Sequence, residues 1–240
     1  MLKKINATLI IILLLSVYGQ SSAQKNNLKD FSISATFSYT NVARMYLYPH
    51  AASVLLRESN VPFNDIFSYA GELRYTISNP VILGLRIEYM KETEFGRNLN
   101  DPRIIVEDGF ELIPVELSAY YYLPFSTQDF KFFMGGGFGI YFAKHLRKFG
   151  DAGLEKVAQK FAYGIQVQVG MDYLITDYLS TRFEMRFRDP EIEVTSKYLQ
   201  EIVHYKDLIL QVDTNNFDTR INVNGVTFTL GVAVNFDLPF

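Results

Sequence analysis

The chain has 240 residues, a formal net charge of −3 at pH 7 and no cysteine. This mild excess of acidic residues differs from the net positive charge typical of nucleic-acid-binding proteins, so we expect no nucleic-acid partner. The lack of cysteine excludes disulfide bonds, thiolate metal sites and a lipidated cysteine. Aromatic residues, all of them Phe or Tyr, make up 15% of the chain. Any fold assigned to the chain has to explain where so many Phe and Tyr side chains lie.

Residues 1–23 carry the pattern of an export signal. Lys3 and Lys4 precede an apolar run of 11 residues from Ala7 to Val17, and the segment ends on small residues at Ser21 and Ala23. A transmembrane helix needs about 20 apolar residues, so the pattern predicts a signal peptide instead. We therefore expect a signal peptide over residues 1–23 and one domain over residues 24–240.

Segments with an apolar side chain at every second position recur along the rest of the chain. The last is the most regular, since every even position from Val226 to Phe240 is apolar. A period of two predicts a strand with one apolar and one polar face. The predicted strands are residues 31–39, 67–77, 81–89, 115–123, 130–142, 161–173, 179–187 and 226–240.

The connections between these strands alternate in length. The short ones fall at 79–80, 124–129 and 175–177, and the long ones at 41–65, 91–109, 144–159 and 189–221. Short turns at one end and long loops at the other are typical of transmembrane β-barrels. We predict an all-β fold, namely an eight-stranded antiparallel up-and-down transmembrane β-barrel. A ten-stranded barrel is the alternative, because residues 51–56 and 208–212 could each form a strand.

The face assignments also predict the parity of the turns. Residues directly opposed in an antiparallel pair share a face. The polar faces fall on even numbers in the strands around Asn79-Pro80 and around Thr176, so both turns need an odd number of residues. The polar face changes from even to odd numbers between residues 123 and 130, so that turn needs an even number.

Three stretches carry a family pattern: the glycine-rich run Phe132 to Gly139, Gly170-Met171-Asp172-Tyr173, and Leu179 to Arg186. They resemble the outer-membrane β-barrel domain of small OmpA/OmpX/OmpW-type and porin-family proteins. The resemblance implies an integral protein of the Gram-negative cell outer membrane, in contact with outer-membrane lipid and lipopolysaccharide. Phe240 is similar to the C-terminal assembly signal that the barrel assembly machinery recognises, although Pro239 departs from that pattern. We expect a monomer.

The polar faces of the predicted strands carry charges of both signs. Eight strands enclose a space that side chains just fill, so inward charges must neutralise one another. We expect a salt-bridged interior, with Arg188 at the end of its strand as a further member. The network consists of Glu72, Arg74, Arg86, Glu88, Glu116, Lys131, Asp172, Arg182, Glu184 and Arg186. The alternative is that these charges line a narrow ion path.

The sequence offers little for catalysis. His50, His145 and His204 all fall in predicted loops, and none has a serine at neighbouring strand spacing. No metal-ligand spacing or phosphate-binding loop is evident, so we predict no catalytic residues, no cofactor and no metal site. The protein is then not an enzyme, and a lipid A-modifying barrel is the enzymatic alternative.

A basic cluster follows the fifth predicted strand. Lys144, Arg147 and Lys148 could contact the phosphates of lipopolysaccharide, although charged loop residues are more often simply solvated. We therefore expect a non-enzymatic envelope structural or surface-interaction role. The alternative is a narrow channel or carrier for small, including hydrophobic, solutes, with which inward aromatic residues are compatible. These residues are Tyr120, Tyr122, Phe133 and Tyr141.

Overall fold

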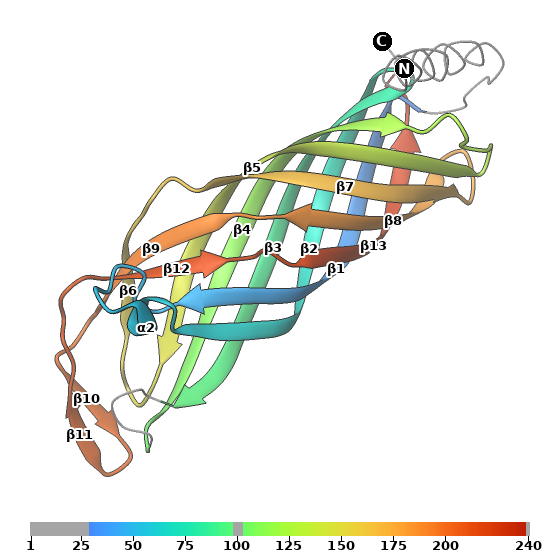
Figure 1. Cartoon of the computed structure of the whole chain (residues 1–240). Helices are drawn as coiled ribbons and strands as arrows, with labels where there is room; N and C mark the ends of the chain where they lie inside the picture. Colours follow the sequence, from blue (N-terminus) through green and yellow to red (C-terminus); the bar gives the residue numbers. More distant parts are fainter. Residues whose placement is uncertain (1–28, 98–102, 239–240) are drawn as a thin grey trace, which may run out of the picture.

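The computed structural model describes residues 29–97 and 103–238, and most of these residues lie in antiparallel strands (Figure 1). In these residues the sheet closes through eight strands, in the order β13-β8-β7-β5-β4-β3-β2-β1, with β13 paired to β1. The predicted eight-stranded barrel is confirmed, and the ten-stranded alternative is wrong. The ring consists of β1 (Phe31–Tyr46), β2 (Asn60–Ser78), β3 (Val81–Arg97), β4 (Ile105–Tyr122), β5 (Phe130–Lys148), β7 (Tyr163–Leu174), β8 (Leu179–Arg188) and β13 (Val226–Phe236).

The predicted signal peptide and Phe240 lie outside the described residues. Among the residues that are described, no helix has the length and apolar character needed to cross a membrane.

The long connections differ most from the sequence predictions, because most of their residues extend the barrel wall. Three further strands prolong the ring: β6 (Leu154–Gln159), β9 (Glu191–Tyr198) and β12 (Phe217–Asn222). Strands β9 and β12 keep the register of β8 and β13, since Val226 lies opposite Phe187 and Asn222 lies opposite Glu191. Helix α2 (Val54–Arg57) and the hairpin of β10 (Ile202–Tyr205) and β11 (Leu208–Gln211) complete this end of the barrel (Figure 1).

An apolar belt surrounds the ring strands on the outside. Aromatic pairs mark its edge near the short turns, such as Phe31 with Tyr75 at 4.9 Å between ring centroids. Another pair, Tyr39 with Phe67 at 5.7 Å, marks the opposite edge. Beyond that edge the outward positions turn polar, and this polar collar consists of Asn41, Asp65, Lys91, Glu111, Lys144, Asp189 and Asn224. An apolar band between aromatic girdles is the surface that a β-barrel presents to hydrocarbon.

The part of the barrel beyond the polar collar is here named the distal wall. It comprises residues 42–64, 92–97, 103–110, 145–161 and 190–223. Its backbone is hydrogen-bonded in strands over much of its length. The sequence predicts loops here, and the structure instead continues the barrel.

The turn parities agree with the face assignments. Thr76 lies opposite Ile82 and Leu174 lies opposite Ser180, so an odd number of residues separates each pair. Tyr122 lies opposite Phe133, so an even number separates them. After a register shift between Thr76 and Ser78, the closing pair Ser78 and Val81 encloses only Asn79 and Pro80, so the odd count holds for the strand pairs before the shift and the turn itself has two residues.

The interior is filled by layers of different chemistry. Near the short turns Tyr120, Tyr122 and Phe133 form an aromatic layer that packs with Ile82. The charged residues come next. Beyond them lies an apolar core of Ala43, Met45, Phe63, Ile66, Met90, Phe110, Leu112, Tyr141, Ala143, Ala162, Ile192, Val194, Ile221 and Val223.

A change of face in β1 helps to form the apolar core. The buried positions of β1 shift from even to odd numbers between Thr40 and Ala43. On the paired strand β2, Asp65 lies beside this shift and has a φ of 55°, in the left-handed region that few non-glycine residues adopt. This irregularity turns Ala43 and Met45 inward, whereas an unbroken alternation from residues 31–39 would place Val42 and Arg44 there.

We expect Phe110→Ala to lower the free energy of unfolding by about 3–5 kcal/mol, because it opens a cavity in the apolar core. Phe110 is 0% exposed and meets Phe63 edge to face at 5.1 Å. The matched control is Phe95→Ala on the neighbouring strand, where the ring is 73% exposed. Denaturant unfolding of the refolded protein measures both values. Equal losses in the two variants would show that the distal interior is not a packed core.

Candidate functional site

Charged side chains from β2, β3, β4, β7 and β8 meet inside the barrel below the apolar core. We call this set the charged layer. It consists of Glu72, Arg74, Arg86, Glu88, Glu116, Asp172, Arg182, Glu184, Arg186 and Arg188. The layer arises because period-two strands point these residues inward at similar depths.

The half of the layer nearer the apolar core is centred on Arg186 and Arg188. Arg186 Nη1 donates to Glu116 Oε2 at 2.7 Å, and its Nη2 donates to Glu184 Oε1 at 3.2 Å. Arg188 donates to both carboxylate oxygens of Glu88, at 2.8 and 3.1 Å, and to Glu116 Oε1 at 3.3 Å. Arg186 Nη1 also lies 3.4 Å from Glu88 Oε2, so Glu88 and Glu116 each face both arginines, as a desolvated network requires.

The half nearer the short turns is centred on Arg74 and Arg182. Arg182 binds both oxygens of Asp172, at 2.7 and 3.1 Å, and donates to Glu72 Oε2 at 3.0 Å. Arg74 Nη2 lies 3.0 Å from Glu72 Oε2 and 3.0 Å from Glu184 Oε2. Glu184 thus links the two halves, because its other oxygen accepts from Arg186.

Two of the predicted network residues hold different positions from the rest. Arg86 donates to the hydroxyls of Thr36 and Ser38, at 3.0 and 3.2 Å, and lies 3.7 Å or more from its carboxylate partners. Lys131 is buried near the short turns, opposite Asp172 in the β5–β7 register. The structure brings the other predicted residues, and Arg188, into direct ion pairs.

The inward tyrosines belong to the same network. Tyr120 donates to Glu72, Tyr122 donates to Asp172 at 3.3 Å, and Tyr141 donates to Glu116 at 3.2 Å. The Arg74 guanidinium also stacks 3.8 Å from the Tyr120 ring centroid. These tyrosines are therefore bonded into the charged layer. The sequence alone also allows them to line a path for a solute.

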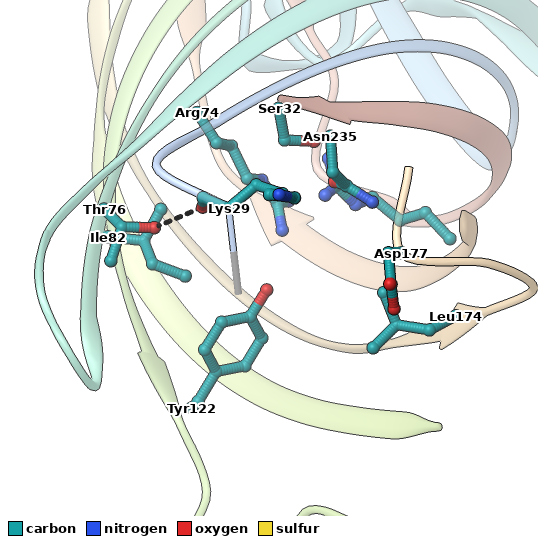
Figure 2. A pocket seen from close by; sticks show the side chains of 10 residues that line it. Lys29, Ser32, Arg74, Thr76, Ile82, Tyr122, Leu174, Asp177 and Asn235 are labelled. Atoms are coloured by element: carbon teal, nitrogen blue, oxygen red, sulfur yellow. Dashed lines mark hydrogen bonds between the residues drawn. The ribbon is translucent and has the colours of Figure 1, made fainter. Parts of the chain in front are cut away.

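A small cavity marks where the interior ends near the short turns (Figure 2). Its volume is about 20 Å³, enough for about one water. Figure 2 shows Arg74 and Tyr122 projecting into it beside Lys29, whose carbonyl accepts a 3.3 Å hydrogen bond from Thr76. Arg74 and Arg182 of the charged layer line this cavity, but every arginine of the layer is at most 2% exposed, so the layer is closed to bulk solvent.

A second charged group lies in the distal wall, outside the belt. Arg147 donates to both oxygens of Asp108, at 2.5 and 3.1 Å, and to the Tyr198 hydroxyl at 3.3 Å. The buried His145 places Nε2 3.4 Å from Asp108 Oδ1. Burial alone would raise the pKa of Asp108, but the hydrogen bonds from His145 and Arg147 hold it below its usual range. Burial lowers the pKa of His145, which favours the neutral ring.

This group corrects one sequence prediction. Arg147 is turned toward Asp108, so it does not project with the neighbouring lysines toward lipopolysaccharide. Lys144 and Lys148 do point outward, opposite Glu111 and Glu107 of β4. The fact that Asp108 and Arg147 share a face could not be read from the sequence, because it depends on the β4–β5 register.

The wall has an irregular seam between β5 and β6. Below it, β5 pairs with β7 as far as Ile140 opposite Tyr163. Above it, the Gln159 side chain donates to the Tyr141 carbonyl at 2.6 Å and accepts from the Ala143 amide at 2.9 Å. Lys156 Nζ adds a 2.7 Å bond to the Ala143 carbonyl. Side chains thus replace a backbone ladder where the wall covers the apolar core.

The histidines each contact a carboxylate. His145 faces Asp108, and His204 Nδ1 lies 3.1 Å from Asp151. His50 Nε2 lies 2.5 Å from Glu193 Oε1.

Comparison with known proteins identifies the architecture. No family model matches the chain, and no curated protein sequence matches it. The crystal structure of the outer membrane protein OprG from Pseudomonas aeruginosa does match, with a TM-score of 0.62 and 13% identity over 89% of this chain and 98% of OprG. The fold is that of a small outer-membrane β-barrel protein. The structure of outer membrane protein AlkL in lipid bilayers also matches, with a TM-score of 0.51 and 13% identity over 92% of this chain and 96% of AlkL.

These likenesses confirm, at the level of fold, the resemblance to small OmpA/OmpX/OmpW-type barrels. At 13% identity they concern the fold alone.

We expect His145→Gln to flatten the pH dependence of stability on the acid side of neutrality. A buried histidine with a lowered pKa contributes stability that is fully present above its unfolded value of about 6.5. That stability is lost as the pH falls from there toward the folded-state value. The measurement is the unfolding midpoint between about pH 7 and pH 5 for both proteins. Parallel curves would contradict a buried neutral His145.

Proposed function

We propose that the protein is an integral outer-membrane β-barrel whose interior is closed and whose distal wall projects beyond the membrane surface. The proposed roles are envelope structure and surface interaction, without enzymatic activity. The apolar belt supports the membrane location, and the two matching barrels are outer membrane proteins by name. Residues 1–23 would direct export, and Phe240 would serve recognition by the assembly machinery. We propose a monomer.

The observation that carries this proposal is the burial of the charged layer between two other layers. The apolar core covers its distal side, and nearer the short turns the aromatic layer packs against Arg74 and Asp172, beside the small cavity. An ion that crossed would have to separate buried ion pairs, and breaking one such pair typically costs about 3–5 kcal/mol. The interior therefore favours a salt-bridged plug over an ion path.

Exposed apolar side chains of the distal wall support a surface-interaction role. Leu55 of α2 is 84% exposed and Ile209 of β11 is 72% exposed. Both lie beyond the polar collar, so the hydrocarbon contact that explains the belt does not explain them. Next to Leu55, Val54 and Leu56 are 61% and 45% exposed, and adjacent exposed apolar groups of this kind suit contact with another macromolecule.

The proposed lipopolysaccharide contact rests on Lys144 and Lys148. Both lysines line an open groove of about 590 Å³ beside the polar collar, and Lys91 lines it too. Amines at this height would face phosphates of the outer leaflet.

We expect the refolded protein to give no ion conductance in planar lipid bilayers. The arginines of the charged layer are at most 2% exposed and each lies within 4.0 Å of a carboxylate, so the proposed closed interior offers ions no open path. A known porin added to the same bilayer serves as the positive control. Steady single-channel current steps from the purified protein would contradict the proposal of a closed interior.

A carrier for small hydrophobic solutes is the second candidate, and the β5–β6 seam favours it. Gln159 and Lys156 hold this part of the wall through side-chain bonds, next to the apolar core. Opening the seam would connect the core with the outside just beyond the belt.

For this candidate we expect Gln159→Ala to speed the entry of a small apolar fluorophore into proteoliposomes, because the variant loses the bonds to Tyr141 and Ala143. The control is Gln200→Ala, which removes a side-chain bond to the Asp151 carbonyl elsewhere in the distal wall. Uptake no faster than in protein-free liposomes, for both the parent protein and Gln159→Ala, would exclude the carrier role.

A further inference from the structure

Three potential metal ligands meet on the outer side of the distal wall, away from the charged layer. His50 follows β1, Glu193 lies in β9 and Asp218 lies in β12. His50 Nε2 is 2.5 Å from Glu193 Oε1 and 3.7 Å from Asp218 Oδ2. The three ligand atoms all lie within 4.8 Å of one another. Segments far apart in the sequence thus place one imidazole and two carboxylates around a common point.

The surroundings of these ligands favour a cation. The Lys160 ammonium lies 2.7 Å from the Glu193 oxygen that faces His50. The Thr195 hydroxyl donates to Asp218 Oδ1 at 2.6 Å, which leaves Oδ2 as the oxygen nearer His50. A hydroxyl that orients a ligating carboxylate in this way is a common outer-shell feature of metal sites.

We propose that His50, Glu193 and Asp218 bind one divalent transition-metal ion, with zinc as the best fit. Zinc accepts imidazole nitrogen and carboxylate oxygen at about 2.0–2.2 Å in tetrahedral geometry, which places ligand atoms roughly 3.4 Å apart. The present separations reach that value through side-chain movements of about an ångström. The imidazole disfavours magnesium and calcium, which prefer oxygen ligands.

The bound ion has a structural consequence. His50 belongs to the segment that joins β1 to β2 and carries α2, whereas Glu193 and Asp218 belong to the wall. Zinc therefore ties this segment to the wall and displaces the Lys160 ammonium from Glu193. The proposal does not depend on whether the interior conducts ions.

The first test is calorimetric titration of the refolded full chain with zinc ions alone. We expect one saturable site, and a fall in affinity of about tenfold or more in His50→Ala, since even outer-shell partners are typically worth 10–100-fold. The matched control is His204→Ala, because His204 contacts a single carboxylate, Asp151, at 3.1 Å. Unchanged affinity in His50→Ala, or equal losses in both variants, would overturn the proposal.

The second test follows the segment itself by limited trypsin digestion. Arg57 in α2 is exposed and offers a cleavage site. Zinc should slow cleavage after Arg57 in the parent protein and in Lys160→Ala, where no ammonium competes for Glu193. It should have no effect in Asp218→Asn. Equal cleavage rates with and without zinc in the parent protein would contradict a metal that joins this segment to the wall.

Discussion

The closed ring of eight strands is the constraint on which the rest of the structure depends. Closure pairs the backbone groups of both strand edges, which apolar surroundings require. It also leaves an interior that side chains must fill. Every inward charge is then desolvated and needs a partner. The chain meets this demand with arginines that each contact more than one carboxylate, as Arg186 contacts Glu116 and Glu184. Tyrosine hydroxyls such as that of Tyr141 satisfy further oxygens.

The barrel reverses its polarity along its length. Within the belt the outside is apolar and the inside is charged, as suits a wall in hydrocarbon. Beyond the polar collar the inside holds the apolar core around Phe110 and the Asp108–Arg147 group, and charged side chains such as Lys148 point outward. The distal wall is thus built like a water-soluble barrel that continues a membrane barrel. A charged, ion-paired layer at the junction explains how one set of strands can serve both environments.

The sequence predicted what a period of two can encode, and little beyond it. The strands, the turn parities and the inward charges followed from local alternation. The distal strands did not, because Asp65 reverses the faces and Pro190 interrupts the wall between β8 and β9. The Asp108–Arg147 pair depends on a register between strands. The meeting of His50, Glu193 and Asp218 depends on three segments at once, so the sequence predicted no metal site. Tertiary pairing supplies this information, and no single segment contains it.

The central claim is that the charged layer is dry and ion-paired, and a double-mutant cycle on Glu116 and Arg186 tests it most directly. Their oxygen and nitrogen lie 2.7 Å apart with both side chains 0% exposed. The measurement compares the free energies of unfolding of Glu116→Leu, Arg186→Met and the double variant. A dry layer predicts that each single change is costly, that the double change is much less so, and that the coupling energy is about 3 kcal/mol or more. A coupling energy below about 1 kcal/mol, as in solvent-exposed pairs, would contradict a dry interior.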